Sequence, residues 1–396
     1  MPDRSANDHW LNRTTVGVGL TSLFSDWSHE MASTILPAFL AALGAGPGWL
    51  GVIEGFSDGL SSVAKLTAGH YTDRLARKKP LVVAGYIVTA AATGALAAAA
   101  SAAHVFAARA TAWLGRGARS PGRKAILAAA VPREAYGRAF GFERMMDTLG
   151  AIVGPLTALW LLQKTAQNYS KIFLWTLVPG ALAAVTFAFL VRERPAAKPP
   201  RATFWHGLRS LPIPFRRLLV AVGVFGLGDF AHTLLILYAT QALAPSLGLA
   251  GAMSLAMALY VVHNAFYAAS AYAGGWLGDH VRRRKHVLAA GYALAAVMAV
   301  LLMHGRQRPL VVGLIFVLAG IYVGVEEALE DSLAAELCPP EQHGMAFGAL
   351  AAVNAVGDFV SSLAVGLLWT QYSPGVAFGA AGVLFLVGAV LVLRLR

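Results

Sequence analysis

The stretch GHYTDRLARKKPLVVAGY, residues 69–86, occurs a second time in a diverged form. The stretch GWLGDHVRRRKHVLAAGY, residues 275–292, matches it at a shift of 206 residues and aligns Asp73 with Asp279. Two further pairs keep nearly the same spacing, namely DWSH (26–29) with DFAH (229–232), and VPREAYGRAFG (131–141) with CPPEQHGMAFG (338–348). The sequence therefore predicts two halves with the same internal order.

The composition indicates that lipid surrounds these halves. Of the 396 residues, 57% are hydrophobic and 13% are charged, and the mean hydropathy is +0.60. Too few polar residues remain to cover a water-soluble core of this size. Apolar runs of membrane-spanning length occur twelve times, at 16–43, 48–72, 80–101, 104–130, 137–163, 170–191, 216–243, 249–277, 286–304, 309–337, 343–370 and 374–394. We expect an all-α membrane protein with twelve transmembrane helices.

A polar connection divides the chain near its middle. Residues 192–215 are rich in Pro and Arg and separate an N-terminal half, 1–191, from a C-terminal half, 216–396. Six helices in each half, in the same order, predict parallel repeats related by an axis along the membrane normal. Lys and Arg gather in this connection and in the loops after residues 73 and 279, which predicts that both termini are cytoplasmic. We expect a multi-pass protein of the cytoplasmic (inner) membrane.

The net charge of +12 belongs largely to this inner belt of Lys and Arg, so a nucleic-acid partner is not expected. The polar N-terminus lacks the pattern of a cleavable signal. The chain has a single cysteine, Cys338, which excludes an intramolecular disulfide framework.

Three motifs resemble one family. The loop of residues 69–79 resembles the signature between helices 2 and 3 of the major facilitator superfamily, and 275–285 is its weaker echo. Arg109 followed by Gly115, Gly117 and Pro121 resembles the signature of helix 4. GAIVGPLTA (150–158) resembles the signature of helix 5 that is associated with antiporters and exporters.

The resemblance implies the fold of that superfamily, an alternating-access cycle and a cytoplasmic latch around Asp73. The residues that we assign to the latch and to the other gating motifs on this ground are Gly69, Asp73, Arg74, Arg77, Arg109, Arg123, Arg144, Asp147, Gly150, Gly154, Pro155, Asp279 and Glu330. The alternative for the basic residues after Asp73 is that they only fix the topology.

A charged stripe lies within the fourth apolar run. Arg109, Arg116 and Arg123 are seven apart and Arg119 is three from Arg116, so they share one side of a helix. A charge at mid-membrane costs at least about 2.5–3.5 kcal/mol, so these side chains should face a wet cavity or a partner. At a shift of 207, the arginines align with acids of the tenth run, Arg119 with Glu326 and Arg123 with Glu330.

We therefore expect a substrate site with charged groups from both halves. Its predicted residues are Arg116, Arg119, Glu326, Glu327, His263 and Asn264. In the alternative interpretation, the arginines and acids neutralise one another, or the arginines pair with Glu143 and Asp147, and lock the halves.

Carboxylates and histidines of three predicted helices are candidate proton carriers. The pattern D-x-x-H occurs at repeat-related positions, and the full set is Asp26, His29, Glu30, Glu54, Asp58, Asp229 and His232. Such groups suit proton transfer near neutral pH. Asp26, His29, Asp229 and His232 also offer the mixed oxygen and nitrogen donors of a divalent-metal site.

An enzyme is not expected. GARSPGRK (117–124) has the glycines of a phosphate loop, but its Lys is displaced, no Ser or Thr follows and no strand precedes it. The sequence predicts a monomeric secondary transporter for proton-coupled export of a small, anionic organic solute, driven by a proton gradient without a cofactor. The alternatives are a divalent-metal exporter of the same fold and a membrane sensor or receptor that transports nothing.

Overall fold

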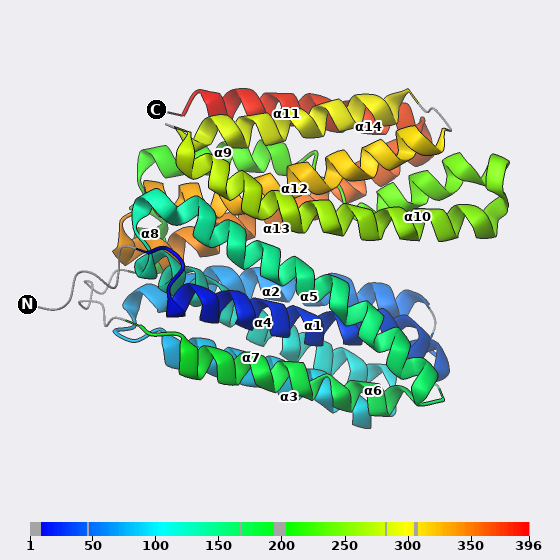
Figure 1. Cartoon of the computed structure of the whole chain (residues 1–396), viewed down its shortest axis with the longest axis horizontal. Coiled ribbons are helices and arrows are strands. Elements are labelled where there is room, and N and C mark those ends of the chain that lie inside the picture. Colours follow the sequence, from blue (N-terminus) through cyan, green and yellow to red (C-terminus); the bar gives the residue numbers. More distant parts are fainter. Residues whose placement is uncertain are drawn as a thin grey trace, which may run out of the picture. The chain divides into compact units, whose positions relative to one another are not determined.

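The computed structural model describes residues 9–45, 47–166, 168–193, 203–281, 283–304 and 308–395. Side chains at 47, 48, 50, 51, 54, 55, 57 and 58 are not described. Within these ranges the regular structure is helical, and Figure 1 shows the order of the helices. The sequence-based prediction of an all-α protein is confirmed.

The helices of the N-terminal half begin and end close to the predicted runs. Their bounds are α1 Arg13–Ala42, α2 Pro47–Arg74, α3 Lys79–Ala95 with the short η2 Leu96–Ala98, α4 Ala102–Ala130, η3 Arg133–Ala135, α5 Tyr136–Lys164, α6 Tyr169–Trp175 and α7 Leu177–Leu190. The short helix α8, Phe204–Arg209, lies in the connection between the halves. The predicted run 170–191 is divided between α6 and α7 at Thr176.

The C-terminal half comprises α9 Ile213–Gly226, α10 His232–His280, α11 Arg284–Met303, α12 Pro309–Leu337, η4 Pro340–Gln342, α13 His343–Gln371 and α14 Pro374–Leu393. The predicted helix over 216–243 is wrong as a continuous helix, because α9 ends at Gly226 and α10 begins at His232. A non-helical Gly248, with φ of 69°, separates two helices within α10, and Figure 1 shows that ribbon folding back on itself. A positive φ is a conformation that Gly adopts without steric cost.

Eight helices of the described chain are long and apolar enough to cross a membrane by length and composition. Helices α1, α2 and α4 are equally long, but they carry many of the polar and charged residues of the N-terminal half. The chain is therefore a multi-pass membrane protein in which several spanning helices carry charge.

The chain divides into two compact units. Unit 1 contains Met1–Arg133, Met146–Leu211 and Cys338–Ala352, and unit 2 contains Glu134–Met145, Pro212–Leu337 and Val353–Arg396. Each unit thus includes a helix start from the opposite half of the sequence, namely the start of α13 in unit 1 and the start of α5 in unit 2. The division of the sequence at 192–215 stays a prediction.

Glycines let α4 lie close to its neighbours in unit 1. A Cβ on Gly115 would lie 2.9 Å from the carbonyl oxygen of Gly85 on α3, and a Cβ on Gly117 would lie 2.7 Å from that of Ser61 on α2. Contacts this short need the absence of a side chain. Backbone proximity of this kind fixes the direction in which the arginines of α4 point.

Candidate functional site

Helices α1 and α4 carry a series of polar contacts in unit 1. From one end to the other, Arg123 Nη1 donates to Ser22 Oγ at 2.6 Å, Arg119 Nη2 donates to Ser25 Oγ, and Arg116 Nη2 donates to Asp26 Oδ1 at 2.7 Å. The arginines are three and four residues apart on α4, and on α1 Ser22 lies three residues before Ser25 and four before Asp26, so one side of each helix faces the other. The predicted stripe on α4 thus meets a matching polar stripe on α1.

The contact between Arg116 and Asp26 is an ion pair. The Asp26 side chain is 8% exposed and that of Arg116 is 25% exposed. Arg116 Nη1 is buried and has no hydrogen-bond partner among the described residues. Its Cζ lies 5.5 Å from the centre of the Trp113 ring. Arg116 therefore combines one anionic partner with one unused donor.

Arg119 and Arg123 contact neutral partners instead. Arg119 is 4% exposed, and its Cζ lies 3.8 Å above the centre of the Tyr86 ring on α3. A desolvated cation over an aromatic ring contributes about 2 kcal/mol. The hydroxyls of Ser25 and Ser22 accept hydrogen bonds from the two guanidinium groups. Arg119 is thus held on two sides within unit 1.

His29 and Glu30 continue the same side of α1. The His29 ring lies edge-on against Trp113, with ring centres 5.1 Å apart. Glu30 is half-buried. Helix α5 lies very close to it, since a Cβ on Gly154 would lie 2.6 Å from Glu30 Cβ. The side chains of Glu54 and Asp58 lie outside the described residues.

The GAIVGPLTA motif packs α5 against α1. A Cβ on Gly150 would lie 2.4 Å from the carbonyl oxygen of Leu23, and Trp27 Nε1 donates to Thr157 Oγ1 at 3.1 Å. Pro155 lies inside α5. The motif therefore has a structural function here, which is to hold α1 in place beside α4.

Unit 2 gathers carboxylates instead of arginines. Glu330, 1% exposed, accepts hydrogen bonds from the Tyr292 hydroxyl and from Asn354 Nδ2 at 2.9 Å. Glu327 accepts from the Tyr267 hydroxyl, and Arg144 Nε lies 2.6 Å from its Oε2. The predicted gating residues Arg144 and Glu330 thus both take part in the polar contacts of unit 2.

A cavity of about 100 Å³ lies among these carboxylates. It is lined by Gly226, Asp229, Val323, Glu326, Glu327, Asn354 and Asp358. Asp229 Oδ1 accepts from the Tyr322 hydroxyl at 2.9 Å. Glu326 is 6% exposed, and its Oε2 has no hydrogen-bond partner among the described residues. The cavity therefore presents several acceptors.

The two copies of D-x-x-H differ in structure. Asp26 and His29 are both on α1, whereas Asp229 lies in the break between α9 and α10 and His232 begins α10. Asp229 and His232 therefore do not share one side of a helix, as the helix predicted over 216–243 would have required. His232 is exposed and stacks on Tyr260, with ring centres 4.8 Å apart.

His263 and Asn264 lie on the second helix of α10. The buried His263 ring lies 5.6 Å from that of Tyr260, and Asn264 is half-buried. In the described part of the chain, no group of three or more His, Cys, Asp or Glu side chains is placed to hold a metal ion. Contacts of the α4 arginines with Glu326 or Glu327 would join different units and stay a prediction.

Both copies of the repeated loop cap a helix. Asp73 accepts from the N–H groups of Gly344 and Met345, each at 2.7 Å, at the start of α13. Asp279 accepts from the N–H groups of Gly137 and Arg138, at 2.8 and 2.9 Å, at the start of α5. Each carboxylate satisfies two free donors and lies at the positive end of a helix dipole.

Glycines make both caps possible. A Cβ on Gly69 would lie 2.3 Å from the Gly344 carbonyl oxygen, and one on Gly275 would lie 2.0 Å from that of Gly137. Arg74 and Arg77 are exposed. The structural basis of the predicted latch is therefore the Gly-to-Asp spacing on α2 and on α10.

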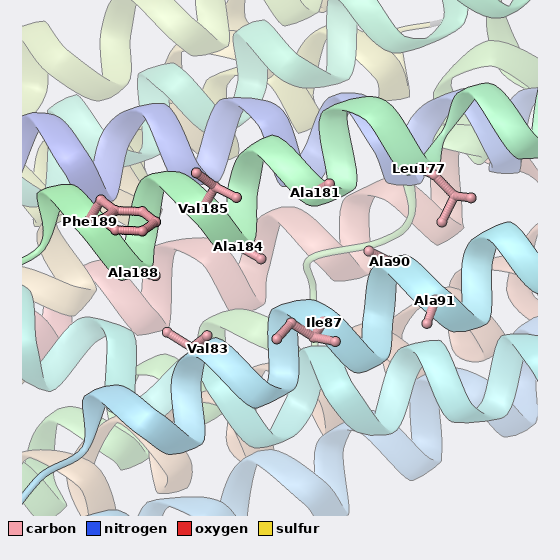
Figure 2. A pocket seen from close by; sticks show the side chains of 10 residues that line it. All are labelled: Val83, Ile87, Ala90, Ala91, Leu177, Ala181, Ala184, Val185, Ala188 and Phe189. Atoms are coloured by element: carbon pink, nitrogen blue, oxygen red, sulfur yellow. The ribbon is translucent and has the colours of Figure 1, made fainter.

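An apolar groove between α3 and α7 is a poor candidate for the solute site. Figure 2 shows its lining, which includes Val83, Ile87, Leu177, Val185 and Phe189, and its volume is about 390 Å³. All ten lining residues are apolar, so nothing in it could orient a charged solute. Ile87 and Phe189 are 54% and 73% exposed, as expected of side chains that face lipid.

Sequence reasoning missed the neutral partners of these charges. Ser22 lies four residues before Asp26 and three before Ser25, so a search for polar stripes on the first helix could have found the two serines. Tyr86 and Tyr292 align at the repeat shift of 206, which is a signal that the sequence-based prediction did not use. Asn354 had no comparable signal, because an isolated Asn in an apolar helix has no periodic partner.

Membrane-spanning helices that bury charged side chains in both units are typical of membrane transporters. The model of the Major Facilitator Superfamily matches residues 18–241 and 218–396, and the chain belongs to this family. An uncharacterised MFS-type transporter of Methanocaldococcus jannaschii is 27% identical over 388 residues, which is 98% of this chain and 96% of that protein.

Two solved structures share the fold. The Escherichia coli fucose:proton symporter has a TM-score of 0.76 at 15% identity, covering 97% of this chain and 99% of that chain. A human organic anion transporter has a TM-score of 0.71 at 18% identity, covering 96% of this chain and 99% of that chain.

Proposed function

We propose that this chain transports a small organic anion together with a proton, and that Arg116 binds the anionic group. The observation that carries the proposal is the ion pair of Arg116 with Asp26, in which Arg116 Nη1 still lacks a partner. A guanidinium group binds a carboxylate through two parallel N–H donors. An anion that used both donors would compete with Asp26.

This competition couples the anion to a proton. Asp26 is 6% exposed, and a carboxylate that is buried without a partner is strongly unfavourable, so a displaced Asp26 takes up a proton. Binding of the anion and of the proton then favour each other, because each weakens the same ion pair. Such linkage supports movement of the anion and the proton in the same direction. The proposal differs here from the export by exchange that the motif on α5 favours.

The remaining parts of the proposal rest on sequence and on fold. The Lys and Arg bias supports cytoplasmic termini in a cytoplasmic membrane, and the proton gradient would supply the energy without a cofactor. Solved structures of this fold include an organic anion transporter and a proton symporter. A metal cargo has less support, because Asp26 is engaged by Arg116 and His29 by Trp113.

The test is uptake into proteoliposomes that contain the purified chain. A panel of radiolabelled lactate, benzoate and succinate is presented with and without an inward proton gradient. We expect gradient-stimulated uptake of at least one anion. Arg116→Gln should weaken its binding by about 1.5–3 kcal/mol, the contribution of a charge-assisted hydrogen bond. Asp26→Asn should still bind the anion, with an affinity that no longer depends on pH.

The matched control is Arg116→Lys, which keeps the charge and should retain part of the uptake. Unchanged anion affinity in a destabilised Arg116→Gln protein would assign Arg116 to structural support. Efflux of a preloaded anion against an inward proton gradient would show exchange and contradict coupled movement in one direction. Binding without flux in the wild type would favour the sensor alternative.

A further inference from the structure

The carboxylate cavity of unit 2 is lined by a residue with a hydrogen-bond acceptor that has no donor among the described residues. Glu326 lines this cavity, is 6% exposed, and has an Oε2 atom without a hydrogen-bond partner among the described residues. Asn354 lines the same cavity, and its Oδ1 is likewise buried without a partner. The amide oxygen of Asn354 only accepts hydrogen bonds, and the carboxylate oxygen of Glu326 does the same when the group is ionised.

The neighbouring carboxylates add negative charge around the cavity, which favours a positively charged ligand. Asp229, Glu327 and Asp358 line the cavity together with Glu326, and Glu330 contacts its Asn354 wall. Arg144 lies 2.6 Å from Glu327 and offsets one of these charges. A buried carboxylate without a partner is strongly unfavourable unless it is neutralised. The cavity is therefore suited to a cation.

Size and donor chemistry narrow the class of cation. A volume of about 100 Å³ corresponds to roughly three water molecules. The described residues contain no cluster of three or more His, Cys, Asp or Glu that could hold a metal ion. A primary ammonium group has three N–H donors, which match the free oxygens of Glu326 and Asn354 and one further carboxylate oxygen.

We propose that this cavity is a binding site for a compact primary ammonium group, with Glu326 and Asn354 as its principal acceptors. The site lies wholly within unit 2. It is therefore independent of the anion site proposed around Arg116 in unit 1. A cargo or effector that carries a protonated primary amine is the class of ligand that it would bind.

The experiment is equilibrium binding of radiolabelled methylammonium to the full chain in nanodiscs of neutral lipid. We expect one saturable site per chain, and binding at least tenfold weaker in Glu326→Gln. Asn354→Leu gives a second, independent variant should Glu326→Gln fail to fold. Tetramethylammonium, which has no N–H donor, should compete at least tenfold less well than unlabelled methylammonium.

The matched control is Glu341→Gln, which removes an exposed carboxylate outside the cavity and should leave methylammonium binding unchanged. Absence of saturable methylammonium binding to the wild type would overturn the proposal, because a cavity that only exchanges protons binds no amine. Equal competition by tetramethylammonium would also overturn it. Saturable Mn²⁺ binding that is lost in Glu326→Gln, without methylammonium binding, would show a metal site instead.

Discussion

At the scale of single residues, the arginines of α4 divide into two classes. Arg116 is 25% exposed at its side chain and has an anionic partner, whereas Arg119 is 4% exposed as a residue and has neutral partners. The sequence-based prediction assigned Arg116 and Arg119 together to the substrate site. From these surroundings we propose a binding function for Arg116 and structural support for Arg119.

Replacing Arg119 with Gln should lower stability without a matching loss of anion affinity. The variant loses the contact at 3.8 Å with the Tyr86 ring and the hydrogen bond to Ser25, for an expected cost of about 2 kcal/mol. Thermal unfolding and anion binding, measured on the same preparation, check this. Tyr86→Phe is the control, since the Tyr86 hydroxyl has no partner among the described residues and its loss should cost little. A loss of affinity equal to that in Arg116→Gln would contradict the division.

At the scale of helices, the starts of α5 and α13 depend on close backbone contacts. A Cβ on Gly344 would lie 2.5 Å from the Gly69 carbonyl oxygen and 2.6 Å from Asp73 Oδ1. The backbone cannot yield as a flexible side chain would. Gly366 lies on the same helix with nothing within 4 Å of its Cβ position.

These two glycines of α13 give a matched pair of variants. Gly344→Ala should destabilise the protein by about 1–3 kcal/mol, the usual cost of overpacking, and should disturb the contact with Asp73. Gly366→Ala should be neutral or stabilising by up to about 1 kcal/mol, because Ala favours helix over Gly. Denaturant unfolding of both purified proteins decides the matter. Equal effects in the two variants would show that crowding at Gly344 is unimportant.

At the scale of the whole molecule, both halves of the repeat have an aspartate that caps a helix, but among the described residues only one of the two aspartates also forms ion pairs. Asp73 accepts two backbone N–H groups in unit 1. Asp279 accepts hydrogen bonds from two backbone N–H groups in unit 2. It also contacts the guanidinium groups of Arg138 and Arg284, each at 2.9 Å. Met345 stands at the repeat position of Arg138, so one copy carries additional charge pairs.

Neutralising the two caps should therefore have unequal effects. Asp73→Asn should cost about 0.5–2 kcal/mol, as for loss of a helix cap, and should slow turnover if the cap acts as a latch. Asp279→Asn should cost about 3–5 kcal/mol, because it also removes the anionic partner of the buried Arg284 and of the partly exposed Arg138. The double variant should lose the sum, since the caps share no partner. Unfolding measurements and uptake rates test this, and equal losses in the two single variants would refute the asymmetry.

The sequence alone predicted an all-helical membrane protein, the internal repeat and the family, although the continuous helix that it predicted over 216–243 was wrong. A spanning helix makes all of its backbone hydrogen bonds within its own segment, so a run of apolar residues defines it without reference to any other part of the chain. The motif from Gly69 to Asp73 could be read for the same reason. Its spacing along one helix is a local property.

The tertiary structure decided the partners of the charged side chains. Arg116 pairs with Asp26, which is 90 residues away, and Glu330 bonds to Asn354 and Tyr292 on two other helices. Helical spacing predicts which residues share a side, but not the neighbour toward which that side turns. That choice depends on backbone approach at glycines such as Gly115 and Gly150, which becomes definite only when the helices pack.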